Sequence, residues 1–390
     1  MGAATPAPTN LILTGRALCI FQIVLWRPVR NCEVDVLRMG IAGLPQVGKT
    51  TFFQIVTKMH GGVLASGRQE AHVGMVAVPD GRLARLSEMF QPRKTVYASV
   101  EYVDTPGSII DLLRAGPQSQ SLREMDALAH VVKAFGEDAS PAAIQSDIEN
   151  VELEMMLSDL AVAEKRLERL AKDVKKQKNQ GLEQELQAIE VCKASLEKQT
   201  PLREATLTPE QERAVRGFTF LSQKPVLYIL NLDENDAVRT GAAEEYAAAA
   251  GLKQRPKTLV SAICGKVEAE LAELSDAEAA EFTASFGLKE SALARIIGSS
   301  YQLLGLISFF TVGEDECRAW TIRSGATALE AAGEIHTDIQ RGFIRAEAVT
   351  YEDLLADGSL AEARTRAHLR LEGKEYVVKD GEIMHFRHSA

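Results

Sequence analysis

The sequence predicts an α/β fold: a domain with a mainly parallel sheet that is interrupted by a helical hairpin and followed by a small α+β domain. Three observations support this class. From residue 39 onward, short apolar segments alternate with helix-like segments, as they do in parallel α/β domains. A glycine-rich phosphate-binding motif separates the first of these strands from the first helix. Residues 144–200 contain no glycine except Gly181 and repeat apolar residues at helical spacing.

Composition narrows the class of protein. A chain of 390 residues, 46% of them hydrophobic, is long enough for two or three domains with real cores. The net charge of −10 does not favour nucleic-acid binding, so an RNA contact would require a local basic patch. The five cysteines include no Cys-x-x-Cys pair and the seven histidines no His-x-x-x-His pair. We therefore expect no disulfide framework, no transition-metal site and a reducing, cytoplasmic location.

Residues 1–38 differ from those that follow. The apolar run Leu18–Trp26 is too short to span a membrane, and no small-residue cleavage site of a signal peptide follows it. Met39 stands where the first strand begins. We therefore interpret 1–38 as an extension that is disordered or that results from a start codon assigned too far upstream, and we expect no membrane attachment.

The phosphate-binding motif is Gly43–Thr50, which fits Gly-x-x-x-x-Gly-Lys-Ser/Thr without substitution. Its glycines let the backbone curl so that the N–H groups of residues 46–49 point at phosphates. Lys49 is expected to reach the β- and γ-phosphates, and the Thr50 hydroxyl to bind Mg²⁺. A strand at Arg38–Ala42 and a helix over Thr51–Met59 flank the motif, which favours a functional loop over a chance match in a turn. The residues predicted to line the nucleotide here are Gly43, Pro45, Gln46, Val47, Gly48, Lys49, Thr50 and Thr51.

The other elements of this domain follow in order. A helix is predicted over Arg82–Phe90, and strands are predicted at Gly74–Val78, Val96–Val103, Leu128–Val132, Lys224–Asn231 and Thr258–Val260. Between the predicted strands Leu128–Val132 and Lys224–Asn231, over residues 144–200, the spacing of apolar residues changes to three and four residues. Apolar residues recur there at Leu153, Met156, Leu157, Leu160, Ala163, Leu167 and Leu170. A second helix runs from Leu182 to about Leu196, which predicts an antiparallel hairpin. Its lysine-rich turn at 172–181 is either a solvated tip or a contact with a phosphate backbone.

Three short motifs follow the phosphate loop in the order of a nucleotide switch, each at the carboxyl end of a strand. In the turn of residues 104–107, Asp104 is expected to hold Mg²⁺ through water and the Gly107 N–H to bond the γ-phosphate. The predicted base contacts, which end the next two strands, are Asn231, Leu232, Ser261 and Ala262. Each motif alone is common in ordinary turns, so the prediction of a nucleotide site depends on the order in which the three occur.

Glu234 stands where GTPases place the aspartate that accepts two hydrogen bonds from guanine. Its extra methylene displaces the carboxylate, so we expect the bidentate bond to be lost. Because sites that depend on paired polar contacts discriminate strongly, we predict a weak guanine preference and a site that accepts ATP, with GTP also able to bind.

From Ile307 onward the pattern changes again. Strands are predicted at Trp320–Arg323, Phe343–Val349, Tyr376–Val378 and Ile383–Phe386, with a turn at Asp380-Gly381 before the last strand. This pattern indicates a small α+β domain over residues 306–390.

These motifs together resemble those of the Obg-like ATPases of the YchF type. The matching runs, within a similarity over residues 39–388, are Gly43–Lys49, Val73–Asp80, Val100–Asp104, Arg318–Arg323, Ile335–Asp338, Arg341–Ala346 and Lys379–Gly381. The resemblance implies a Ras-like P-loop NTPase domain over 39–305 with the hairpin 144–200 inserted, and a β-grasp (TGS) domain over 306–390. It also implies slow Mg²⁺-dependent ATP hydrolysis, a monomer, association with the ribosome through its large subunit, and RNA contact through the helical and TGS domains. Without the resemblance, Arg345, Arg370 and Lys374 are ordinary surface charges.

Several positions depart from the family pattern. Arg68 lies where the family has a metal-ligating threonine, although Ser66 could take that role. Ser108 replaces an apolar residue after the Asp104–Gly107 turn. Gln46 replaces an asparagine that holds K⁺ in potassium-dependent relatives, so K⁺ binding stays open.

These departures leave two functions open. The first is a slow ATPase that switches ribosome engagement, and the second is a nucleotide-binding scaffold or sensor that no longer hydrolyses. A plain GTPase is a third, which Glu234 disfavours. For catalysis, Arg68 is a candidate arginine finger, and His72 is a solvated loop residue or, less favoured, a water-positioning group.

Overall fold

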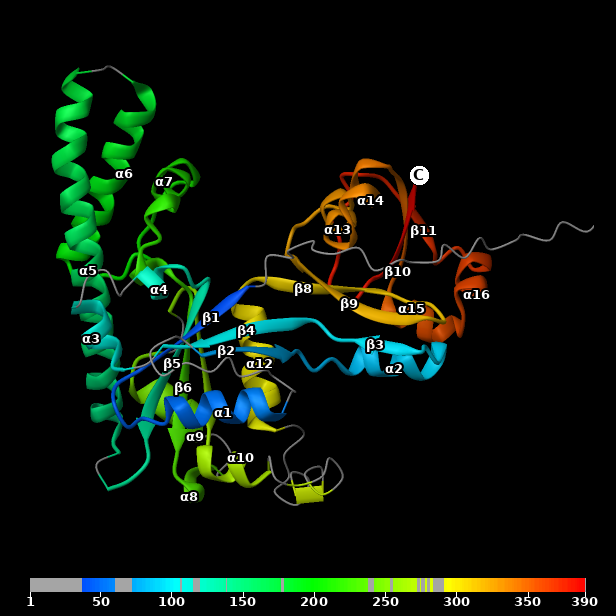
Figure 1. Ribbon diagram of the computed structural model, residues 1–390, viewed down its shortest axis with the longest axis horizontal. Helices are drawn as coiled ribbons and strands as arrows, with labels where there is room; N and C mark the ends of the chain where they lie inside the picture. Colours follow the sequence, from blue (N-terminus) through cyan, green and yellow to red (C-terminus); the bar gives the residue numbers. More distant parts are fainter. Residues whose placement is uncertain are drawn as a thin grey trace, which may run out of the picture. The chain divides into compact units, whose positions relative to one another are not determined.

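The computed structural model describes residues 37–59, 72–105, 107–114, 120–137, 139–176, 179–237, 242–252, 255–271, 274, 278, 281–282 and 291–389. The predictions about residues 1–36, Ser66, Arg68 and Pro106 lie outside these ranges. None of the helices within them combines the length and the apolar character that a membrane span requires. Two six-stranded sheets organise the described chain (Figure 1).

The first sheet forms the predicted α/β domain. Its strands lie in the order β2 (His72–Ala77), β4 (Ser99–Asp104), β1 (Arg38–Ala42), β5 (Ala127–Ala134), β6 (Val226–Leu232) and β7 (Thr258–Ile263). Neighbouring strands are parallel except β2 and β4, so the carboxyl ends of β4, β1, β5, β6 and β7 meet at one edge. Besides the hairpin described below, the helices between these strands include α1 (Lys49–Met59), α2 (Gly81–Phe90), α3 (Ile109–Arg114), α4 (Gln120–Arg123), α8 (Glu234–Ala237) and α9 (Ala242–Ala249), and α10 (Gly265–Leu271) and α12 (Ala292–Leu303) follow the last strand.

Both faces of this sheet are covered, and the sequence of β5 shows why. Ala129 and Val131 belong to the apolar core that includes α1 and α12. The alternate residues Leu128 and Val132 belong to the core that includes α3 and α5 (Pro141–Lys176). Side chains of a strand alternate between the two faces, so a strand that is apolar throughout is buried on both. The carboxyl ends of the strands therefore belong to a sheet that is packed on both faces.

The predicted helical hairpin is confirmed as α5 and α6 (Gln180–Glu197), the long pair in green in Figure 1. α5 starts before the predicted insertion and takes part in two cores. Its first half buries Ile144 and Ile148 against the sheet. Its second half buries Ala163 and Leu170 with α6 and α7 (Pro209–Val215). One continuous helix therefore carries the hairpin and anchors it to the nucleotide-binding domain.

A buried polar cluster fixes α5 where these two cores meet. The Asp159 side chain is fully buried and accepts hydrogen bonds from Arg123 Nη1 at 2.8 Å, from the Ser222 amide at 2.7 Å and from the Leu221 amide at 3.0 Å. Ser222 Oγ adds a fourth bond at 2.8 Å. Arg123 belongs to α4, and the other donors to a 3-10 turn, Leu221–Gln223. Burial raises the pKa of the Asp159 carboxyl, which the Arg123 charge and the three hydrogen bonds from Ser222 and Leu221 oppose.

The second sheet lies in the C-terminal part of the chain but includes one strand from the first domain. Its order is β11 (Arg370–Glu372), β10 (Phe343–Val349), β12 (Ile383–His388), β8 (Leu306–Thr311), β9 (Glu316–Arg323) and β3 (Lys94–Val96). The predicted single strand Val96–Val103 is therefore wrong. Its first residue belongs to β3, which pairs with β9, and its second part is β4 of the first sheet. A continuous run of apolar residues cannot reveal that its two ends pair with different sheets.

One further strand prediction needs correction. Tyr376–Val378 is not a strand, since only Val377 forms a bridge, to Thr327. Tyr376 instead donates its hydroxyl to Glu382 at 2.5 Å. β8 and β11 were not predicted from the sequence. The helices of this part of the chain are α13 (Ala328–Ile335), α14 (Thr337–Arg341), α15 (Tyr351–Asp357) and α16 (Leu360–Thr365).

Candidate nucleotide-binding site

The phosphate loop connects β1 to α1 at the carboxyl edge of the first sheet. Gly43, Gln46 and Gly48 have positive φ values of 148°, 62° and 98°, so the backbone of the loop turns sharply at three positions. A Cβ atom on Gly43 would lie 2.5 Å from the Val131 carbonyl oxygen, and one on Gly48 would lie 2.6 Å from Asn231 Nδ2. Neither contact is sterically allowed, so both positions require glycine. The loop leads into the amino terminus of α1, where free amides and the helix dipole favour an anion.

Lys49 and Asp104 lie together at this edge. Lys49 Nζ donates to the Leu44 carbonyl at 2.8 Å, so the side chain folds back over the loop. Asp104 ends β4 and is opposite Ile41 of β1, with 5% of its surface exposed. Burial lowers the pKa of Lys49 and raises that of Asp104, and the attraction between the two charges opposes both shifts. The two charges therefore compensate each other's burial only in part. A phosphate beside Lys49 and a metal ion beside Asp104 would complete that compensation.

The turn after Asp104 rests directly on the phosphate loop. The Ile109 amide donates to the Gly43 carbonyl at 3.4 Å, and Ser108 is buried beside it. Gly107 has a φ of 97°, which a residue with a side chain rarely adopts. The structure therefore brings Gly107, Asp104 and the loop together, as the sequence predicts.

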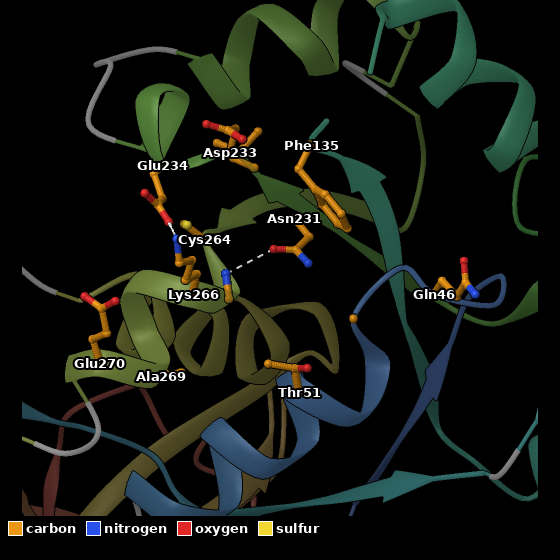
Figure 2. Close-up of a pocket in the computed structure, with 13 residues that line it drawn as sticks. Gln46, Thr51, Phe135, Asn231, Asp233, Glu234, Cys264, Lys266, Ala269 and Glu270 are labelled. Carbon is orange, nitrogen blue, oxygen red and sulfur yellow. Dashed lines mark hydrogen bonds and ion pairs between the residues drawn. The ribbon is translucent and has the colours of Figure 1, made fainter. Parts of the chain in front are cut away.

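Asn231 clamps two loops with one amide group. Its Nδ2 donates to the Val47 carbonyl at 3.0 Å, and its Oδ1 accepts from the Gly265 amide at 3.0 Å (Figure 2). The side chain thus fixes the phosphate loop to the segment after β7. The sequence predicts Asn231 as a base contact, and the structure gives it this second, positioning role.

A cavity of about 600 Å³ runs from the phosphate loop past the ends of β5, β6 and β7. Small-molecule sites commonly have this volume. It is lined by Gln46, Gly48, Thr51, Phe135, Asn231, Leu232, Asp233, Glu234, Cys264, Gly265, Lys266, Ala269 and Glu270 (Figure 2). Six of these residues were predicted. Phe135 and the run Cys264–Lys266 were missed, although each directly follows a strand of the sheet.

Ser261 and Ala262 do not line this cavity. β7 continues to Ile263, so both residues lie inside the strand, with 4% and 5% of their surfaces exposed. The predicted end of the strand came too early, because Ser261 resembles a turn residue but is buried. The segment that reaches the cavity begins at Cys264.

His72 is not a solvated loop residue. It is the first residue of β2, half-buried, paired in register with Asp104 and stacked on Phe53 at 6.0 Å between ring centroids. Its charge lowers the pKa of Asp104 in the same sense as that of Lys49. His72 therefore lies beside the candidate metal ligand, within the sheet.

A second polar surface lies on the C-terminal sheet. Arg345 of β10 pairs in register with Arg387 of β12, and two positions further along Glu347 pairs with His385. Glu347 is buried, and both Arg387 and Arg364 of α16 form ion pairs with it. The three arginines are exposed, so this face carries an excess of positive charge. Arg370, by contrast, contacts Glu382 and Tyr376.

Comparisons with known proteins agree across the chain. The family model YchF-GTPase_C, described as a protein of unknown function (DUF933), matches residues 306–389. The ribosome-binding ATPase YchF of Bacillus subtilis is 39% identical over 373 residues, which cover 90% of this chain and 99% of the relative. The protein of the same name from Escherichia coli O157:H7 is 37% identical over 373 residues, with coverages of 90% and 98%. The structure of the Schizosaccharomyces pombe YchF GTPase superposes with a TM-score of 0.77 at 29% identity, covering 93% of this chain and 99% of that one. This likeness confirms the predicted fold class.

Proposed function

The chain belongs to the YchF family of ribosome-binding ATPases, and on this basis we propose that it binds and slowly hydrolyses ATP with Mg²⁺ and couples its nucleotide state to the ribosome. The observation that carries the proposal is the continuity of the site. One cavity joins the phosphate loop at Gly48 to the ends of β6 and β7 at Asn231 and Gly265. A nucleoside triphosphate would fit along this cavity, with its phosphates at the phosphate loop and its base at the ends of β6 and β7.

The polar residues divide into two roles at the phosphate end. The amides of residues 46–49 and the Lys49 ammonium hold the β- and γ-phosphates, and the Gly107 amide holds the γ-phosphate. The Thr50 hydroxyl and the Asp104 carboxylate are oxygen donors of the kind that Mg²⁺ prefers, Asp104 acting through water. The metal ion, when bound, neutralises charge on the phosphate oxygens. The chain's own contribution is to hold the triphosphate in position for reaction.

At the base end, Phe135 and Leu232 provide apolar surface, and Cys264 and Gly265 line the cavity beside them. Glu234 lines the same end, at the position where GTPases carry aspartate. Equilibrium competition against a fluorescent nucleotide tests the resulting base choice. ATP is expected to compete at least as well as GTP. A preference for GTP of about tenfold or more, equivalent to about 1.4 kcal/mol, would contradict the proposal.

A nucleotide-binding scaffold without hydrolysis is the second candidate. The observation that favours it is Ser108, which replaces an apolar residue and lies buried against the phosphate loop, where the turn must sense the γ-phosphate. Both candidates predict the same binding, so only turnover separates them.

For the partner, we propose that a monomer contacts RNA of the large ribosomal subunit through the arginine face of Arg345, Arg364 and Arg387. Exposed arginines at matched register on a sheet are suited to successive phosphates. The lysine-rich tip of the hairpin is a second candidate contact. Its residues Lys175 and Lys176 end α5.

Reversing the charge of Arg345 and Arg387 together is expected to weaken ribosome binding. Each arginine–phosphate interaction that a substitution removes lowers the slope of log affinity against log salt by about one, so the slope for Arg345→Glu/Arg387→Glu should fall by about two. Co-sedimentation with ribosomes over a range of salt concentrations measures this slope. The matched control is Arg85→Glu/Arg93→Glu, which reverses two exposed arginines elsewhere and leaves the same net charge. Equal slopes for the two variants would refute the assignment of this face.

A further inference from the structure

A lysine and a glutamate that line the cavity contact each other at its base end. Lys266 Nζ forms an ion pair with Glu234 Oε1, and Figure 2 shows the two side chains meeting. Glu234 begins α8 after β6, whereas Lys266 lies on α10 after β7. Glu270, one turn further along α10, adds a second negative charge near Lys266. The lysine is thus placed between two carboxylates at the edge of the proposed base site.

We propose that Lys266 is a specificity-determining residue that holds the Glu234 carboxylate away from guanine and so favours adenine nucleotides. This inference rests on the proposed function, because it assigns a role within the same nucleotide site. The extra methylene of glutamate by itself already weakens the guanine preference, because it displaces the carboxylate. The ion pair weakens it further, because Lys266 occupies that carboxylate.

The chemistry of the two bases explains the direction. Guanine presents two donors, N1–H and the exocyclic amine, which together require a carboxylate with both oxygens available. The Glu234 carboxylate already accepts from an ammonium group, so guanine must displace Lys266 before it can bind in this way. Adenine presents an acceptor, N1, next to an amine donor. A lysine N–H beside a carboxylate oxygen offers the complementary pair.

The exposure of the pair sets the size of the effect. Lys266 is 72% and Glu234 49% exposed, and ion pairs in such positions are weak. The expected change in selectivity is therefore about two- to fivefold rather than a reversal by orders of magnitude. High salt should reduce it, because exposed charges are screened.

The test is the affinity ratio of two nucleotides in the full-length Lys266→Met variant. Dissociation constants for Mg²⁺-ATP and Mg²⁺-GTP are measured by competition against one fluorescent nucleotide. The dissociation constant for GTP divided by that for ATP is expected to fall about two- to fivefold relative to the wild type. The matched control is Lys193→Met, which removes a lysine between Glu164 and Glu197 on the hairpin and should leave the ratio unchanged.

A double-mutant cycle tests whether Lys266 acts through Glu234. In the Glu234→Gln background the carboxylate is gone, so adding Lys266→Met should change the ratio by much less than it does in the wild type. An unchanged ratio in Lys266→Met, with both nucleotides still bound, overturns this inference and leaves the proposed function intact. An equal shift in both backgrounds overturns the role of Glu234 as the intermediary. If the wild type binds neither nucleotide, the proposed function fails, and this inference fails with it.

Discussion

Replacing Asp159 with alanine is expected to destabilise the protein by about 3–5 kcal/mol, the cost of leaving one partner of a buried ion pair without the other. Asp159 is fully buried and Arg123 nearly so, with 7% of its surface exposed. Removal of the carboxylate deprives the Arg123 guanidinium of its ionic partner and two backbone amides of their acceptor. Chemical denaturation measures the loss as a shift of the midpoint at constant slope.

Two further variants test whether the loss of stability comes from the buried ion pair and not from any change on α5. Glu164→Ala, on the exposed side of α5, removes an ion pair with Lys193 and should cost no more than about 1 kcal/mol. Arg123→Met added to Asp159→Ala should recover part of the loss, because it removes the unpaired charge. A cost below about 1 kcal/mol for Asp159→Ala alone would show that this cluster does not anchor the hairpin.

The second large effect is expected at Lys49. The Lys49→Ala variant should bind ATP about ten- to a hundredfold more weakly, because charge-assisted hydrogen bonds to phosphate contribute about 1.5–3 kcal/mol. Its hydrolysis should fall to background, since the same group stabilises charge in the transition state. Nucleotide titration and single-turnover assays measure the two losses.

Stability distinguishes this functional loss from misfolding. Burial lowers the pKa of Lys49, which means that the folded protein holds this charge at a cost that Asp104 only partly offsets. Alanine removes this cost but also takes a charge partner from the buried Asp104, so the two effects oppose each other and the denaturation midpoint of the nucleotide-free protein should change little. Lys193→Ala on α6 serves as the control for loss of a lysine far from the site along the chain. A Lys49→Ala variant that binds ATP like the wild type would refute the assignment of the phosphate end.

The parts of the fold that the sequence predicts are those encoded in contiguous segments. The phosphate loop, Asp104 and Asn231 each follow a short apolar strand, and the parallel sheet brings strand ends together, so their meeting was foreseeable. Lys266 and Phe135 lie at strand ends too, but no motif marks them. Ser261 was misplaced because its residue type indicates a turn, whereas its burial in β7 is decided by packing.

Pairings between distant segments were beyond prediction. The division of residues 94–104 between two sheets depends on β9, which lies more than two hundred positions further along the chain. The Asp159 cluster joins α5 to residues 36 and 63 positions away, and none of the three segments carries a pattern that announces the others. Such contacts depend on the assembled tertiary structure, which local periodicity does not contain.

The most direct test of the central claim is single-turnover hydrolysis of ATP by the full-length protein with Mg²⁺, measured beside Lys49→Ala and with and without ribosomes. The proposed ATPase predicts a slow rate that exceeds that of Lys49→Ala in both conditions. ATP binding without any hydrolysis above the Lys49→Ala rate would contradict it, and would identify the protein as a nucleotide-binding scaffold.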